Sequence, residues 1–167
     1  MGYTIKYYLH LEIKPENFKK AIDIFNHMHT DEMLLKYARG SGYKNKDNPV
    51  STYRWYSWVS NPDKPYETLK DAFTNWSIVE IDHRMRINDY TKNFVINGSY
   101  YNKWGQQDLL LEFLAPVLEN ACVDVIGEDN ARYLWRIENN VFSSINYMDR
   151  SYDGVSVSND IMALSGL

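Results

Sequence analysis

The stretch Ile78-Val-Glu-Ile-Asp-His-Arg-Met-Arg-Ile-Asn88 indicates the fold class, because apolar and charged side chains alternate along it. Successive side chains of a strand point to opposite faces, so this pattern predicts a half-buried strand with a charged outer face. The apolar set is Val79, Ile81, Met85 and Ile87, and the polar set is Glu80, Asp82, Arg84, Arg86 and Asn88.

The residues that follow predict a ββαββ unit, and we expect the chain to be organised around this unit, residues 78–142. A Leu-rich helix should be kinked or ended early by Pro116, and Gly98 should mark a bulge or a close approach. The expected elements are strands at 78–88 and 94–101, a helix at 109–120, a hairpin of 122–126 with 131–137, and a short run at 141–147 after the Asn139-Asn140 turn.

The N-terminal half adds a strand and two helical regions. Residues Thr4–Ile13 alternate as cleanly as the first stretch, Pro15 suits the first turn of a helix, and Thr30 suits the cap of a second short helix. The chain is therefore expected to be one α+β domain at 1–148 with a loosely attached polar tail at 149–167. We expect a mostly antiparallel sheet with three helices packed on one face, from residues 15–38, 66–76 and 107–120.

An aromatic segment and the basic loop before it form the candidate binding region. Residues 51–60 are read as a strand with aromatic side chains on both faces, which suits a central strand or a face exposed for a partner. Aromatic residues make up 15% of the chain, and they serve cores and recognition surfaces alike. The candidate partner-binding residues are Arg39, Tyr43, Lys44, Lys46, Tyr53, Trp55, Tyr56 and Trp58.

Composition narrows the class of protein. A net charge of −4 makes nucleic acid an unexpected main partner, and no apolar run is long enough to span a membrane. The single cysteine, Cys122, fits a reducing cytoplasm and is expected to be a small core residue. We therefore expect a cytoplasmic protein without a membrane partner.

No stretch of the chain matches a catalytic or cofactor-binding motif, so no catalytic residue, metal or cofactor is assigned. His27 and His29 diverge on a helix and fit its C-terminus better than a metal site. Glu80 and Asp82 could share a metal, but a solvated charged face explains them more simply. His83 fits a hydrogen-bonded core histidine, and the turn at 127–130 fits a hairpin.

The C-terminal half resembles small αβ proteins carried by bacteriophages, plasmids and other mobile elements of bacteria. The resemblance lies in Leu109–Asn120, in Val123-Asp-Val-Ile-Gly-Glu-Asp129, and in Arg132-Tyr-Leu-Trp-Arg-Ile137, and it covers residues 94–142. These proteins have no assigned activity, so no catalytic residue is carried over. The resemblance implies an accessory protein of a mobile element.

Three functional hypotheses follow. The first is a non-enzymatic phage or mobile-element protein that binds and inhibits a bacterial host protein, with an anti-CRISPR role as its sharpest form. The second is a binder or hydrolase of a small nucleotide, which would use Arg39, Lys44 and Lys46 with stacking from Tyr43, Trp55 or Trp58. The third is a structural protein that assembles as a homo-oligomer.

Overall fold

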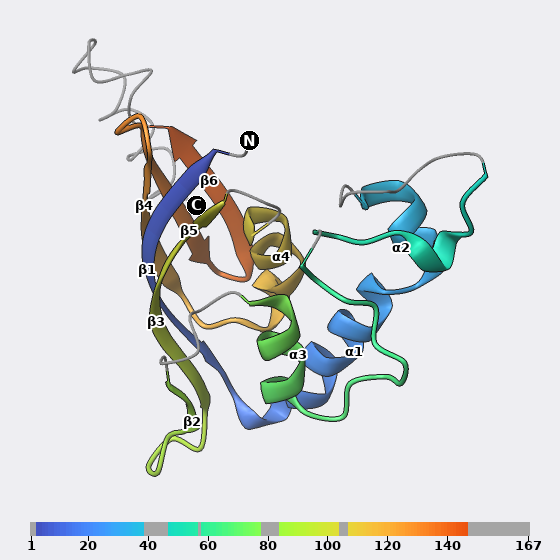
Figure 1. Ribbon diagram of the computed structural model, residues 1–167. Helices are drawn as coiled ribbons and strands as arrows, with labels where there is room; N and C mark the ends of the chain where they lie inside the picture. Colours follow the sequence, from blue (N-terminus) through green and yellow to red (C-terminus); the bar gives the residue numbers. More distant parts are fainter. Residues whose placement is uncertain (1–2, 39–46, 57, 78–83, 104–106, 147–167) are drawn as a thin grey trace.

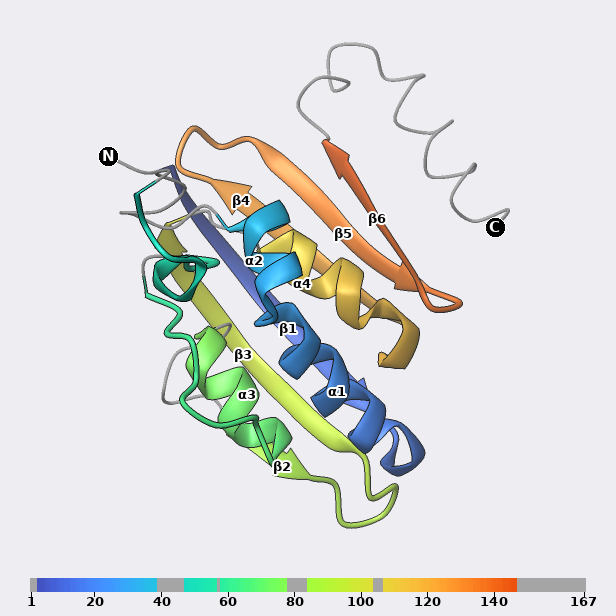
Figure 2. The ribbon, with the colours of Figure 1, turned by 90° about the vertical axis from the view of Figure 1, so that its right-hand side faces the viewer.

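The computed structural model describes residues 3–38, 47–56, 58–77, 84–103 and 107–146, and it contains a six-stranded antiparallel sheet with helices on one face (Figures 1 and 2). The strand order is β2-β3-β1-β4-β5-β6, which confirms the α+β class. The strands are β1 (Thr4–Ile13), β2 (Arg84–Ile87), β3 (Phe94–Lys103), β4 (Ala121–Gly127), β5 (Arg132–Glu138) and β6 (Val141–Asn146). The helices are α1 (Phe18–Met28), α2 (Asp31–Tyr37), α3 (Leu69–Trp76) and α4 (Gln107–Leu114).

The centre of the sheet is β1 and not the stretch at 78–88. β1 pairs with β3 on one side and with β4 on the other, so it lies between the two hairpins of the predicted ββαββ unit. β2 is a four-residue edge strand, and its Ile87 side chain is 48% exposed. Residues 78–83 and the predicted tail at 149–167 lie outside the described residues.

The predicted alternation of buried and outward side chains along Thr4–Ile13 is confirmed. Every second side chain of β1, from Ile5 to Ile13, is at most 2% exposed and packs toward the helices. The register with β3 runs without interruption from Thr4↔Lys103 to Ile13↔Phe94. The bulge expected at Gly98 is therefore absent from this pairing, and Gly98 lies directly opposite Leu9.

The helices begin and end where their local chemistry dictates. Pro15 opens a three-ten turn before α1, and Pro116 lies in a three-ten turn directly after α4, which confirms the predicted early end. Thr68 caps α3 by accepting a hydrogen bond from the Asp71 N–H at 3.1 Å, so this helix starts three residues later than predicted. Thr30 holds the cap position of α2, but its hydroxyl donates to the His27 carbonyl.

The hairpin turns are as predicted. Asn130 has φ 63°, and Asn139 and Asn140 have φ 51° and 65°. Asparagine tolerates this left-handed region better than most residues, and tight hairpins require it. These turns fix the registers of the β4–β5 and β5–β6 pairs.

The predicted aromatic strand at 51–60 is wrong. Its described residues form a three-ten turn, Val50–Thr52, and a loop that runs along the helical layer (Figure 1). Trp55 is 0% exposed, donates its indole N–H to the Met28 carbonyl at 2.7 Å and stacks on Tyr37. Aromatic side chains on both sides suit a loop enclosed by helices as well as a central strand, so the pattern alone does not separate the two.

Hydrogen bonds from α1 hold the end of this loop. The Asn26 side chain bonds both the N–H and the carbonyl of Tyr66, at 2.7 and 3.1 Å. The His29 ring lies 3.2 Å from Asn61 Oδ1 and 3.0 Å from the Tyr66 hydroxyl. Burial lowers the pKa of His29, so this imidazole is held neutral between its partners.

Truncating Trp55 tests its place in the core. Trp55→Ala should lower the free energy of unfolding by about 3–5 kcal/mol, because a fully buried ring is lost and a cavity remains. Tyr90→Ala is the matched control, since Tyr90 is 94% exposed and its loss should cost less than about 0.5 kcal/mol. Urea denaturation measures both, and equal stabilities would contradict the core assignment.

The His29 site predicts a pH-dependent stability. Because the pKa of His29 is lower in the folded chain than its ordinary 6.5, the unfolded chain binds the proton first. Stability should therefore fall as the pH drops below about 6.5, by at most about 1.4 kcal/mol per pH unit from this group. Denaturation between pH 5 and 7.5 should show a shallower slope for His29→Gln than for the wild-type chain, and an equal slope would contradict this assignment.

Candidate functional site

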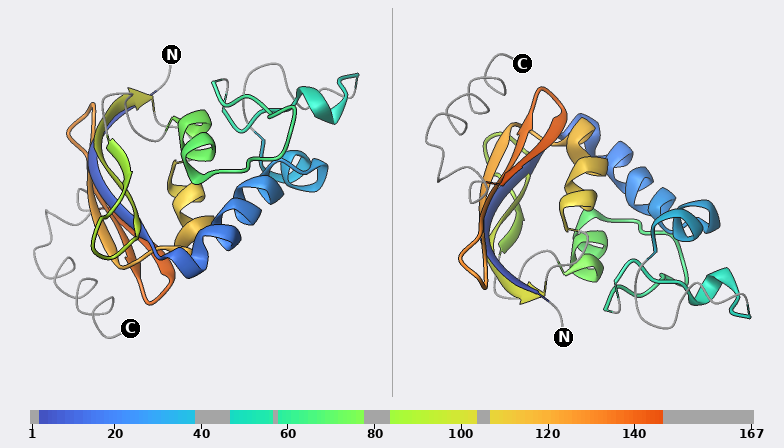
Figure 3. Two further views of the ribbon diagram at one scale, coloured as in Figure 1. Left: turned by 90° about the horizontal axis from the view of Figure 1, so that it is seen from below. Right: turned by 90° about the horizontal axis from the view of Figure 1, so that it is seen from above.

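The sheet face turned away from the helices carries polar and aromatic side chains, and no described helix covers it (Figure 3). We call this surface the open face. It arises because the residues between the buried positions of each strand must point the other way. Its polar and aromatic members on the three central strands include Lys6, Tyr8, His10 and Glu12 of β1, Asn97, Ser99 and Tyr101 of β3, and Cys122 and Asp124 of β4. Val95, Lys103 and Ile126 share this face, and Val95 is 1% exposed.

Two exposed tyrosines lie on neighbouring strands of the open face. The Tyr8 and Tyr101 side chains are 59% and 67% exposed. Tyr101 is opposite Lys6 in the β1–β3 register, so it is the diagonal neighbour of Tyr8, roughly 7–8 Å away. The Tyr8 hydroxyl donates a hydrogen bond to Asn97 Oδ1, so its ring leans over β3 toward Asn97, on the side of Ser99 away from Tyr101.

A polar pocket opens where the pairing of β1 with β4 changes register by one residue. The regular pairing ends at Tyr7↔Val125 and resumes at the bridge Ile13↔Leu118. Tyr7 and Ile13 are six residues apart, whereas Val125 and Leu118 are seven apart, so one extra residue is accommodated before and within β4. Such a bulge redirects side chains and is frequent beside functional sites.

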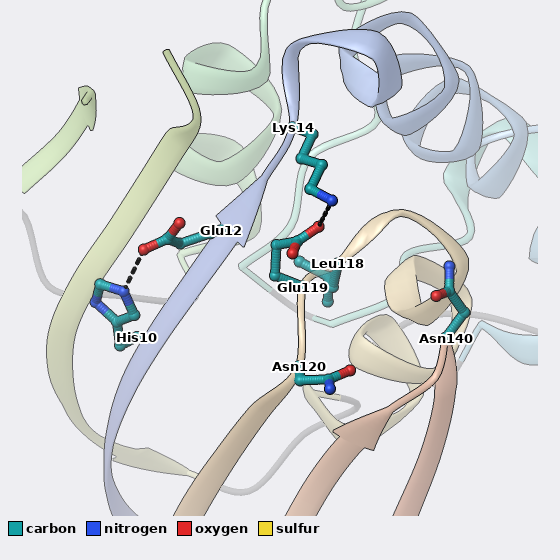
Figure 4. Close-up of a pocket in the computed structure, with 7 residues that line it drawn as sticks. All are labelled: His10, Glu12, Lys14, Leu118, Glu119, Asn120 and Asn140. Atoms are coloured by element: carbon teal, nitrogen blue, oxygen red, sulfur yellow. Dashed lines mark hydrogen bonds and ion pairs between the residues drawn. The ribbon is translucent and has the colours of Figure 1, made fainter. Parts of the chain in front are cut away.

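We call this cavity the β1–β4 pocket. It has a volume of about 430 Å³ and combines side chains from the end of β1, the approach to β4 and the β5–β6 turn (Figure 4). Figure 4 shows His10 and Glu12 on one side of the β1 ribbon and Asn120 and Asn140 on the other. The lining residues are His10, Glu12, Lys14, Leu118, Glu119, Asn120 and Asn140.

Two hydrogen bonds hold the Glu12 carboxylate in this pocket. The carboxylate accepts a hydrogen bond from the Asn93 side chain at 2.9 Å and lies 2.8 Å from His10 Nε2. These two bonds, with the nearby positive charge of Arg86, hold the pKa of Glu12 below its ordinary value. The carboxylate is therefore ionised at neutral pH, although its side chain is only 28% exposed.

The lining offers both donors and acceptors of hydrogen bonds. It contains carboxylates, amides, an imidazole and an ammonium group. Among the described residues, no group of three or more His, Cys, Asp or Glu side chains is placed to hold a metal ion. The arrangement suits a polar ligand that donates and accepts hydrogen bonds.

The predicted partner-binding residues do not meet at this site. Tyr53, Trp55 and Tyr56 are buried in the helical layer, and Trp58 is half-buried and stacks on Tyr56. The rings expected to recognise a partner or stack on a nucleotide are thus mainly core residues. Arg39, Tyr43, Lys44 and Lys46 lie outside the described residues.

The structure also bears on the predictions for Cys122 and for the pair His27 and His29. Cys122 is exposed and not a core residue, because it alternates with the buried Val123 and Val125 of β4. His27 is exposed, whereas both ring nitrogens of His29 are engaged, so the two do not converge on a metal. Glu80, Asp82 and His83 lie outside the described residues.

The turn at 127–130 behaves as a structural turn. Asp129 accepts hydrogen bonds from the Ala131 N–H, at 2.9 Å, and from the Tyr3 hydroxyl, which ties the N-terminal end of β1 to the β4–β5 hairpin. These bonds lower the pKa of the exposed Asp129 carboxyl. These two hydrogen bonds account for the position of the Asp129 carboxylate, and no ligand is needed to explain it.

Comparison of the chain with family models, with curated proteins and with solved structures gives no match. None of the described helices has the length and apolar character needed to cross a membrane. The functional conclusion therefore rests on the open face and the β1–β4 pocket.

Removing the strongest partner of Glu12 tests the electrostatics of the pocket. Asn93→Ala should raise the pKa of the Glu12 carboxyl toward its ordinary value of 4.5, because the Asn93 hydrogen bond is the largest cause of the shift. An NMR titration of the side-chain carboxyl carbon measures this. Asn97→Ala, which removes an amide of the open face that bonds Tyr8, is the matched control and should leave Glu12 unchanged.

Proposed function

We propose that this protein is a non-enzymatic binding protein of a phage or mobile element that binds and inhibits a bacterial host protein through its open face. A host defence system, as in anti-CRISPR inhibition, is the sharpest form of this proposal. The bacterial host is suggested by the resemblance in residues 94–142. The binding role is supported by the structure of the open face.

The observation that carries the proposal is the exposed pair Tyr8 and Tyr101. Most described tyrosine and tryptophan side chains are buried or half-buried, whereas these two are more than half exposed and lie on neighbouring strands of one sheet face. Tyrosine combines a large apolar area with a polar end and is enriched at the centres of protein interfaces. A sheet face with two such side chains fits a folded protein partner.

The surroundings of the pair indicate the chemistry of this partner. Lys6 is exposed directly opposite Tyr101 and belongs to no ion pair among the described residues. A partner surface with a carboxylate beside an apolar patch would complement it. The net charge of −4 disfavours nucleic acid at the same surface.

Capture of the host protein tests the proposal. The tagged chain, mixed with lysate of a bacterial host, should retain one stoichiometric partner, and the purified partner should lose activity when it is bound. Tyr8→Ala with Tyr101→Ala should weaken binding roughly 100-fold, since buried interface tyrosines are each worth about 1–2 kcal/mol. Tyr90→Ala, at an exposed tyrosine in the β2–β3 turn, should bind as wild type.

The single cysteine offers an independent readout. Cys122 is exposed on the open face, so a docked partner should slow its alkylation. Undiminished binding by the double tyrosine variant would contradict the proposal. Turnover of a substrate without a stoichiometric partner, or a large homo-oligomer formed through the open face, would also contradict it.

A further inference from the structure

The β1–β4 pocket presents acceptor oxygens from both of its sides. Each Glu12 oxygen takes part in one hydrogen bond, with His10 or Asn93, and keeps a lone pair. Asn140 donates its Nδ2 to the Pro116 carbonyl at 2.6 Å, so its Oδ1 remains available as an acceptor. Glu119 adds a second carboxylate to the lining.

The charges in the pocket leave an excess of one negative charge. Glu12 and Glu119 stand against Lys14, with His10 counted as neutral, and Arg86 acts on Glu12 from outside the lining. Lys14 Nζ lies 3.5 Å from Glu119 Oε1, and the two side chains are 48% and 38% exposed. Such a long, solvated ion pair is weak, so a better donor can displace Lys14 from Glu119.

We propose that the β1–β4 pocket binds a guanidinium group, supplied by an arginine side chain of the protein that docks on the open face. This inference rests on the proposed function and names the contact that the partner makes at the C-terminal end of β1. The guanidinium fork carries five N–H donors in one plane and pairs with carboxylates through two parallel hydrogen bonds. An anionic ligand would instead meet Glu12 and Glu119.

The pocket lies within reach of the same docked partner. His10 belongs both to the open face and to the lining, and it is the next outward-facing residue after Tyr8. Tyr8 and Glu12 are four residues apart on one strand, which is roughly 13 Å. A protein interface of standard size covers about 800 Å² on each partner and spans this distance easily. Arginine is also among the residues enriched at interface centres.

An NMR titration with N-acetyl-arginine methylamide tests the inference without the partner. Saturable shifts are expected at the backbone amides of Glu12, Glu119 and Asn140. Glu12→Gln and Glu119→Gln should each weaken this binding at least tenfold, because each removes a charge and keeps the shape. Glu32→Gln, on the exposed side of α2, is the matched control and should change nothing.

The capped citrulline derivative, which has the same shape without the charge, should give no saturable shifts. Equal shifts with citrulline, shifts elsewhere in the chain, or an unchanged affinity of both glutamine variants would overturn the inference. The titration contains no partner protein, so a negative result concerns the guanidinium site alone. The proposed function is tested separately by the tyrosine variants. If the host protein is captured through Tyr8 and Tyr101 but capped arginine does not bind, only the guanidinium site is rejected.

Discussion

The pairing of β1 with β3 and β4 is the constraint on which the rest of the structure depends. β1 is ten residues long, and its register with β3 is continuous over its full length. A slip of one residue would move Ile5, Leu9 and Leu11 to the outer face and bring Tyr8 and His10 inside. The same register therefore determines both the buried core and the composition of the open face.

The strands and most helix ends could be predicted from the sequence, because their signals are local. Alternation identified Thr4–Ile13, and Pro15, Pro116 and the Asn139-Asn140 pair marked ends and turns. Which strand is central is not a local property. β1 reaches that position because the chain returns to it twice, from β3 and from β4, and no pattern within residues 78–142 records this.

The candidate site was harder to predict, because its parts come together only in the folded chain. Asn93 reaches Glu12 from the β2–β3 turn, and Asn140 joins the pocket lining from the β5–β6 turn, where it bonds the Pro116 carbonyl. The sequence did contain one usable signal, since Tyr8 and His10 occupy the outward positions of a strand whose other face is apolar. The prediction for the aromatic loop failed for a related reason. Trp55 is buried against Tyr37, Trp76 and Phe113, which are far from it in the chain, and its indole N–H bonds the Met28 carbonyl.

The extra residue before and within β4 follows from the demands of the core. Had the register continued from Tyr7↔Val125, Glu119 would lie opposite Ile13 and would point its carboxylate among buried apolar side chains. An unpaired buried carboxylate costs far more than one bulge, so the register shifts and Leu118, 3% exposed, takes that place. Glu119 is turned outward by the same shift, while its N–H still donates to the Glu12 carbonyl at 2.9 Å. The step that satisfies the core thus places Glu119 on the open side of the sheet, where it lines the same pocket as Glu12.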